Sequence, residues 1–293
     1  ENDSNVDRFT LYFVTEENAV VNGLTSGTID FTPRLSSDLL DLVHADGDLE
    51  EASAETYGSY AMIGLQCGDY SPFHDINLRK AFSYCIDRQM IADTIMGGGV
   101  ALQQWIPQGS LGYDETLVPI YDVELAKEYM AKSDYSGEEI VLYANSPVNN
   151  AENIATAICD YARAVGINMS LQITEQAYTT EVRNTGEYDA YLVTNSSTGD
   201  VGPYTITRLS HPGANHNFYN DRLDELLEEL ELTIDLDKRD EIEREINQII
   251  YDNCVLVSLF TMDYHYVARK GLSGWYIPYS GYFYCENIRV DEV

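Results

Sequence analysis

The chain has 293 residues, of which 44% are hydrophobic, so it is long enough to form one large domain or two ordinary ones with a buried core. Its net charge of -32 arises from 49 acidic and 17 basic residues, and a surface this acidic repels nucleic acids and anionic lipids. The sequence has no run of about 18 apolar residues, which excludes a membrane-spanning helix.

The first residues of the chain predict short elements. Residues 8–14 (RFTLYFV) alternate in polarity well enough for a strand, and residues 16–31 predict a short helix, a turn that contains glycine and a brief strand. Residues 35–43 (LSSDLLDLV) predict another short helix, and residues 60–66 (YAMIGLQ) predict a strand. Helices and strands are thus mixed from the start of the chain.

Residues 71–91 (SPFHDINLRKAFSYCIDRQMI) predict an amphipathic helix that begins at Asp75, a good N-cap residue. Its apolar residues have the spacing of a stripe that faces a core, and they are Leu78, Ala81, Phe82, Cys85 and Ile86. Its polar residues form an adjacent row that contains Arg79, Ser83 and Asp87, with Lys80 and Arg88 beside it. We interpret this row as a structural feature, so replacing Arg79 or Asp87 by alanine is expected to lower stability.

The middle of the chain alternates strands with helices. Strands are expected at residues 138–144, 167–173 and 188–194, and helices at residues 151–166 and 176–184. The first of these helices has one apolar face, made by Ile154, Ile158, Tyr161 and Val165. Alternation at this spacing predicts βαβ units and therefore a parallel sheet.

The last third of the chain predicts two acidic helices followed by strands. The helices are expected at residues 221–232 and 237–251, each with a leucine or isoleucine face, and their acidic residues are interpreted as solvated faces. Strands are expected at residues 254–260, 264–270 and 282–290.

A search for catalytic or metal-binding motifs in the sequence is negative. His211 and His216 lie in a loop with proline and glycine, without an HExxH helix or a cysteine pair nearby, so a structural role is preferred over metal binding. The glycines at 97–99 follow a helix instead of opening one, which indicates a helix stop and not a phosphate-binding loop. No GxSxG motif occurs. The residues alone therefore predict no enzyme.

The cellular compartment stays open on the residues alone. The opening residues ENDSNVDRF lack the basic and apolar parts of a signal peptide, so either the protein is cytosolic or the chain begins after an export signal. The five cysteines contain no CxxC pair, and an odd number does not describe a closed disulfide framework. Cys85 and Cys159 have the spacing of buried helix residues.

The segment SPFHDINLRKAFSYCIDR resembles the signature of the extracellular solute-binding proteins of family 5, which are the peptide, nickel and oligosaccharide receptors of ABC importers. The resemblance continues into GGGVALQQWIPQGSLGYD. Upstream, GLTSGTIDF resembles the family's L-x-x-G-x-[IV]-D-[FI] element. Downstream, GEYDAYLVT, NDRLDELLEELELTIDLDKRDEIEREINQII and VSLFTMDYHYVARKGLSGW follow in the order of the family.

Members of this family have two α/β lobes that close on a ligand. The resemblance therefore implies an α/β fold: a periplasmic-binding-protein-like (type II) lobe with a mixed sheet flanked by helices, plus part of a second lobe. On this mapping, residues 1–62 are part of domain I, residues 63–272 are the C-terminal lobe (domain III), and residues 273–293 return to domain I. Because family members are longer, we expect the chain to be a fragment that corresponds to their C-terminal part.

The resemblance also implies a ligand-binding loop. In peptide-binding members, an Asp in a W-x-x-D-x-x-[DE]-P loop anchors the α-amino group of the ligand, because a buried ammonium needs a charge partner. Here the best match is Asp200, and the expected ligand-binding residues are Asp200, Gly199, Thr198 and Asn195. The loop lacks the Trp, and Gly202 replaces the acidic residue before the proline. An ordinary turn residue is therefore the alternative interpretation of Asp200.

By resemblance, the protein is the substrate-binding component of an ABC importer that captures oligopeptides by lobe closure and passes them to a permease. It is expected to be extracytoplasmic and monomeric, without cofactor, metal or nucleic acid, and tethered to the membrane only through a lipid anchor absent from this chain. The altered loop leaves open a nickel chelate, an oligosaccharide or another small solute as cargo. A hydrolase is the distant alternative, because no nucleophile, base or metal set converges.

Overall fold

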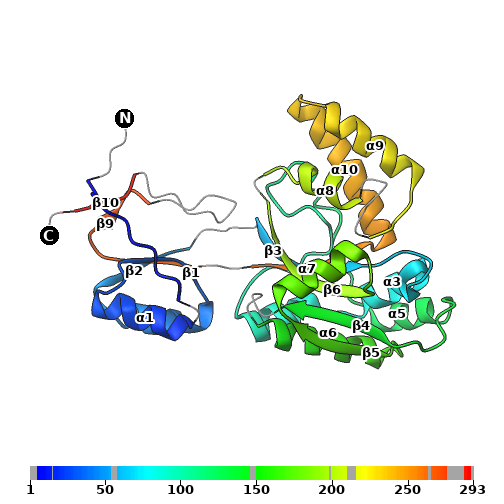
Figure 1. Ribbon diagram of the computed structural model, residues 1–293, viewed down its shortest axis with the longest axis horizontal. Helices are drawn as coiled ribbons and strands as arrows, with labels where there is room; N and C mark the ends of the chain where they lie inside the picture. Colours follow the sequence, from blue (N-terminus) through cyan, green and yellow to red (C-terminus); the bar gives the residue numbers. More distant parts are fainter. Residues whose placement is uncertain are drawn as a thin grey trace.

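Two larger sheets with separate hydrophobic cores organise the chain, and a small two-stranded sheet accompanies them in the described residues, as the computed structural model shows (Figure 1). One sheet has three strands in the order β1-β8-β2, and the other has five strands in the order β5-β4-β6-β3-β7. Helices flank both sheets, so the predicted α/β class is confirmed (Figure 1). The structure describes residues 5–14, 16–53, 58–145, 150–197, 199–209, 216–262, 265–275 and 287–291.

The smaller unit is the three-stranded antiparallel sheet with short helices against it (Figure 1). Its elements in chain order are α1 (Glu17–Ser26), β1 (Phe31–Leu35), the 3-10 helix η1 (Ser37–Leu39), α2 (Leu40–His44), β2 (Leu49–Ser53) and β8 (His265–Arg269). Helix α1 ends where Gly27 takes a left-handed conformation with φ of 74°. The core of this unit consists of Val21, Leu24, Leu35, Val43, Leu49 and Val267.

Strand β8 corrects one expectation about the division of the chain. We expected residues 265–269 inside the lobe of residues 63–272, but β8 pairs with β1 and β2 in the smaller sheet. Its Val267 is fully buried in the smaller core. The chain first passes from the smaller sheet to the larger one between β2 and β3. We expected residues 60–62 in the first domain, but Tyr60, Ala61 and Met62 belong to the larger core. Periodicity predicts a strand but not the sheet that the strand joins.

The larger sheet is mixed in direction. Its strands are β3 (Ser59–Leu65), β4 (Ile140–Asn145), β5 (Met169–Thr174), β6 (Ala190–Ser196) and β7 (Leu256–Thr261). Strand β4 is parallel to both β5 and β6, whereas β3 is antiparallel to β6 and β7. Helices α6 (Ala151–Ala164) and α7 (Gln176–Thr185) connect the parallel strands, which confirms the predicted βαβ units.

Helix α6 shows why this part of the sequence folds as predicted. Ile154 and Ile158 are fully buried in the larger core, and Val165, just after the helix, is buried as well. Tyr161, at the edge of the same face, is half-buried and packs against the core from outside. Gly166 then takes φ of 96°, a left-handed conformation that suits the chain reversal into β5.

The signature segment forms two consecutive helices rather than one. After the short 3-10 turn η2 (Pro72–His74), Asp75 caps α3 (Ile76–Tyr84) by accepting a hydrogen bond from the Asn77 amide at 2.8 Å. Asp87 caps α4 (Arg88–Ile91) by accepting from the Met90 amide at 3.0 Å. A π-helical turn, η3 (Ala92–Met96), follows and ends at Gly97, in accord with the predicted helix stop.

The remaining helices are α5 (Val123–Met130), α8 (Gly202–Leu209), α9 (Asp221–Leu232) and α10 (Leu236–Asn253). Helices α9 and α10 pack side by side as a hairpin (Figure 1). Their predicted apolar faces are buried, through Leu223, Leu226, Leu227, Leu230, Ile242, Ile246 and Ile250. Among the described residues, no helix has the length and apolar character needed to cross a bilayer.

The predictions at the two ends of the chain differ from the structure. Residues 8–14 form no strand, and Phe13 is 91% exposed. Alternation predicts a strand only where a partner strand and a core are available, and here neither covers these side chains. Of the strand predicted at residues 282–290, β10 (Arg289–Val290) pairs with β9 (Leu272–Ser273), while residues 276–286 lie outside the described part.

Candidate ligand-binding edge

The candidate site lies where β6 ends and α8 begins. In open α/β sheets ligands bind beyond the carboxyl ends of the parallel strands, and β6 delivers residues 195–201 to that edge. Both connections between the two sheets pass here. The Ser197 amide donates a hydrogen bond to the Gly58 carbonyl at 2.6 Å, and the Met262 amide donates to the Ser59 carbonyl at 2.7 Å. The loop therefore lies beside the chain segments that lead from one sheet to the other.

The expected site residues before Asp200 are held by contacts within the chain. Asn195 is half-buried in β6, and its side-chain amide contacts the Met62 sulfur. Gly199 has φ of 99°, and its carbonyl accepts a hydrogen bond from the Leu111 amide at 2.9 Å. Thr198 lies outside the described residues. The loop is thus anchored to the segment after residue 109, where Ser110 and Ser197 also share a hydroxyl–hydroxyl contact at 2.7 Å.

Asp200 is the residue on which peptide recognition was expected to depend, and its carboxylate is already paired. The Arg239 guanidinium approaches it with Nη2 at 2.9 Å and Nε at 3.1 Å from Oδ2. The other oxygen accepts from the Gly202 amide at 2.7 Å, which caps the start of α8. The side chain remains 34% exposed. Asp200 therefore has the turn role and an ion pair within the chain, and the anchoring of a ligand's amino group stays a prediction.

Glu243 completes this cluster from helix α10. Its side chain is 1% exposed, and Oε1 accepts from the Arg239 guanidinium at 3.3 Å. Burial, together with the neighbouring Asp200 carboxylate, raises the pKa of Glu243 to about 8, against the opposing effect of Arg239. Burial also acts to raise the pKa of Asp200, but hydrogen bonds with Glu243 and Arg239 outweigh it and lower the pKa. The raised pKa of Glu243 favours its protonated form, and Arg239 with Asp200 is then the opposite-charge pair of the cluster.

Little in the sequence pattern indicated this cluster. Arg239 and Glu243 lie in the helix whose charged residues we interpreted as a solvated face, 39 and 43 positions after Asp200. Their i,i+4 spacing places them on one side of the helix, and this spacing was the sign in the sequence that their side chains contact each other. Gly202 has a packing role, because a Cβ there would lie 2.5 Å from the Arg239 guanidinium.

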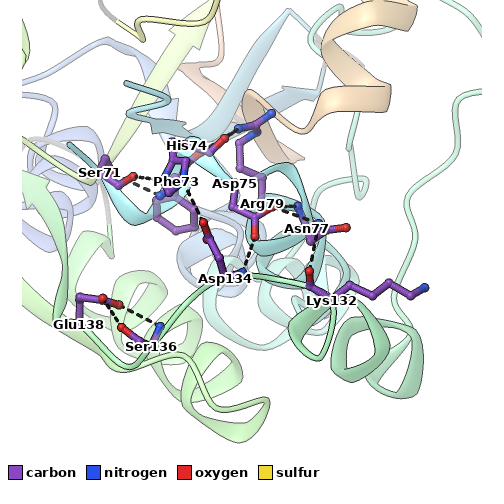
Figure 2. A network of polar contacts seen from close by, with 10 residues as sticks. All are labelled: Ser71, Phe73, His74, Asp75, Asn77, Arg79, Lys132, Asp134, Ser136 and Glu138. Carbon is purple, nitrogen blue, oxygen red and sulfur yellow. Dashed lines mark hydrogen bonds and ion pairs between the residues drawn. The ribbon is translucent and has the colours of Figure 1, made fainter. Parts of the chain in front are cut away.

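The charged row of the signature segment makes structural contacts, as expected, but its two arginines are buried rather than solvated. Arg79 is 4% exposed and donates to the carbonyls of Phe73 and His74 at 2.7 and 2.9 Å (Figure 2). Arg88 is 2% exposed and donates to the carbonyls of Ser258 and Ser83 at 2.8 and 2.9 Å. These arginines connect the signature helices to β7 and to the end of α10, where Arg79 also reaches the Asn253 carbonyl.

His216, Cys85 and Cys159, which the sequence analysis singled out, have structural surroundings. His211 lies outside the described residues, and His216 is fully buried, with Nδ1 2.9 Å from the Leu65 carbonyl. Cys85 and Cys159 are buried, as predicted. Burial raises the pKa of the Cys159 thiol to about 11. Within the described ranges, no group of three or more His, Cys, Asp or Glu side chains is placed to hold a metal ion.

Comparison with known proteins shows which family the chain resembles. Residues 1–217 match the model of the bacterial extracellular solute-binding proteins, family 5 Middle. The chain is 25% identical over 285 residues to the probable D,D-dipeptide-binding periplasmic protein DdpA of Escherichia coli K12, an alignment that covers 94% of this chain and 54% of the relative. The chain thus spans about half the length of that curated relative.

Solved structures share the fold. The ABC transporter substrate-binding protein CtaP of Listeria monocytogenes superposes with a TM-score of 0.84 at 17% identity, over 95% of this chain and 59% of that one. The dipeptide-binding protein of Pseudoalteromonas sp. SM9913, in complex with Met-Leu, gives a TM-score of 0.81 at 20% identity, over 95% and 57%. Type II periplasmic-binding-protein architecture is thereby confirmed. With its family model matched over most of its length, the chain belongs to the bacterial extracellular solute-binding proteins of family 5, a family of binding proteins.

Proposed function

We propose that the protein captures small extracellular solutes, oligopeptides above all, and delivers them to the membrane permease of an ABC importer. The observation that carries the proposal is the family match over residues 1–217, which includes the signature helices and the loop after β6. The dipeptide-binding names of its relatives support peptides as the cargo. The protein performs no chemistry in this proposal, because binding and release are sufficient for import.

Capture proceeds by closure of two lobes on the ligand. The two crossings of the chain lie beside each other, joined by the Met262–Ser59 hydrogen bond, so a small backbone change there moves one sheet against the other. A ligand that contacts both lobes stabilises the closed form and shifts the population toward it. The loop at residues 195–201 lies next to these crossings and is our proposed ligand contact, with Asn195, Thr198, Gly199 and Asp200 as its members.

Recognition of a peptide amino group needs a rearrangement in this proposal, because the Asp200 carboxylate is paired with Arg239. An ammonium group has to share Asp200 with the guanidinium, or main-chain contacts and bridging waters have to supply the affinity. The same pairing favours a second candidate, in which the cargo is a solute without a free amino group at this end, such as an oligosaccharide or a metal chelate.

The proposal places the protein outside the cytoplasm, as a monomer. The extracellular family and the periplasmic relative support this location. A lipid anchor outside the residues of this chain is part of the proposal, and so is the assignment of the smaller unit to domain I and of the larger unit to domain III.

Ligand-retention mass spectrometry on the full-length protein tests the proposal. The protein is purified under native conditions, denatured, and its released small molecules are identified. Peptides in stoichiometric amount are expected, and a glycan or a chelate would move the second candidate to first place. Turnover of added peptide, abolished by a single substitution, would overturn the binding function altogether. Because the chain spans about half the length of its curated relative DdpA, we expect part of the wall around the ligand to lie outside it, and calorimetry with the 293-residue chain should detect only weak peptide binding.

A further inference from the structure

Two adjoining cavities lie at the opposite edge of the larger sheet from the proposed ligand loop. The first, of about 540 Å³, opens beside residues 185–189, immediately before β6 begins. The second, of about 420 Å³, lies between residues 69–74 and 134–139. Tyr70 and Asp189 line both, so one extended ligand can reach from one into the other.

Tyrosine rings form the walls of the first cavity, and hydrogen bonds fix their positions. Tyr70 donates to the Gly186 carbonyl at 3.0 Å and accepts from the Asn217 side-chain amide at 2.9 Å. Tyr188 is buried and packs edge-on against Tyr191, with ring centroids 5.1 Å apart. Tyr143 supplies a third ring from β4. A site with pre-positioned aromatic faces binds cations without first ordering its walls.

The charge of the lining is negative. Asp189 accepts hydrogen bonds from the Val141 amide at 3.1 Å and the Ser71 hydroxyl at 3.2 Å, and burial raises its pKa. Across the described part of the chain, no basic side chain lies within ion-pair distance of Asp189.

The second cavity adds further carboxylates, those of Asp69, Asp134, Glu138 and Glu139. Figure 2 shows Asp134 in contact with His74, at 3.2 Å, and Glu138 in contact with Ser136. His74 is the single basic residue that lines the two cavities.

We propose that this tyrosine–carboxylate cavity binds an alkylammonium group, presented either by the side chain of a lysine residue or by a free polyamine. The rings offer their negative faces to the cation, and Asp189 offers a partly buried carboxylate that lacks a cationic partner in the described chain. The shared lining suits a ligand with two separated positive charges, one in each cavity. This site is distinct from the loop after β6 and does not depend on the proposed import function.

Isothermal titration calorimetry on the purified chain tests the proposal at about 0.15 M salt, where diffuse attraction to the acidic surface is screened. The probes are spermidine, N-acetyl-lysine methylamide and the uncharged N-acetyl-norleucine methylamide. Saturable binding of at least one of the amines is expected, and the norleucine derivative is expected not to bind. The amine that binds more tightly identifies the natural source of the ammonium group.

Three variants locate the binding. Asp189→Asn removes the charge, and Tyr143→Leu removes one aromatic ring at a half-buried position while it keeps an apolar side chain there. Asp237→Asn, on the exposed start of α10, changes the net charge equally but lies away from both cavities. The two cavity variants should weaken amine binding by about tenfold or more, and Asp237→Asn by less than about twofold.

Several results would overturn the proposal. Equal losses in Asp189→Asn and Asp237→Asn would show diffuse counterion attraction only. Equal binding of the norleucine derivative would show an apolar pocket, and absence of amine binding at millimolar concentration would remove the site. Thermal melts of each variant confirm that a loss of binding is not a loss of fold, and Tyr143→Leu keeps the test decisive if Asp189→Asn unfolds.

Discussion

Arg88 and Arg239 both have little exposure to solvent, but their guanidinium groups donate hydrogen bonds to different kinds of acceptor. Arg88, in the signature helices, donates to carbonyl oxygens and to the Ser83 hydroxyl, all of them neutral. Arg239, beside the candidate ligand loop, pairs with the Asp200 carboxylate and donates to the carboxyl group of Glu243. The acceptors of Arg88 do not titrate, so the pH does not change them. The acceptors of Arg239 include carboxyl groups, which do titrate. The protein thus uses a fixed connection in the lobe core and a titratable one at the edge that we propose contacts the ligand.

The largest expected effect comes from breaking the fixed connection. Replacing Arg88 by methionine leaves the Ser258 and Ser83 carbonyls without their donor inside the core, at a cost of about 3–5 kcal/mol in the free energy of unfolding. Urea denaturation measures this. The control is Arg222→Met, where exposed ion pairs with Glu225 and Glu245 are lost and the change should stay within about 1 kcal/mol. Similar losses in both variants would contradict the comparison.

The next effect comes from Arg239→Met, with an expected loss of about 2–4 kcal/mol at neutral pH. The substitution leaves the Asp200 carboxylate without its cation and removes the donor to the Leu230 and Thr233 carbonyls. In a double-mutant cycle with Asp200→Asn, part of this loss should be recovered, because the unpaired charge is gone. Strict additivity of the two substitutions would show that the pair is not coupled.

A pH titration of stability sharpens the contrast. The folded pKa of Glu243, about 8, lies above its ordinary value of 4.5, so the folded protein binds this proton more tightly than the unfolded chain. The stabilisation is fully present below about pH 4.5 and is lost as the pH rises toward 8. Glu243→Gln should therefore become more stable relative to the unchanged protein between pH 5 and 8, by a few kcal/mol at most. A constant difference across this window would refute the assignment.

The smallest effect concerns a helix cap in the signature segment. Asp87→Ala removes the acceptor for the Met90 amide at the start of α4 and should cost about 1 kcal/mol. A thermal melt measures it, and Asp87→Asn, which keeps an acceptor oxygen, should recover most of the loss. A melt without a shift would mean that α4 does not need this cap.

Local patterns in the sequence allowed much of the fold to be predicted. The Asp75 cap, the buried face of α6 and the leucine face of α9 were predictable, because each depends on residues within a few turns of one another. The membership of β8 in the smaller sheet was not predictable, because it depends on pairing with strands more than 200 residues earlier. For the same reason Asp200 was found from a motif, while its partner Arg239 was not.

The burial of the arginines in the signature segment was likewise not predictable from the sequence. A charged residue on a helix is normally interpreted as solvent-facing, and for Lys80, which is partly exposed, that interpretation is adequate. Arg79 and Arg88 depart from it because their long side chains reach carbonyls at the ends of other elements. Such acceptors have no sequence signature, since every residue carries a carbonyl.

The Met262–Ser59 hydrogen bond has a consequence for how the chain can be cut and rejoined. Residues 58–262 enter and leave the larger sheet on the adjacent strands β3 and β7, and these residues contain the whole larger core. In terms of gene architecture, residues 58–262 are an insertion into the chain of the smaller unit. The two ends of this insertion lie next to each other. We expect it to fold autonomously when expressed alone, and to accept new termini elsewhere once residues 58 and 262 are joined by a short linker.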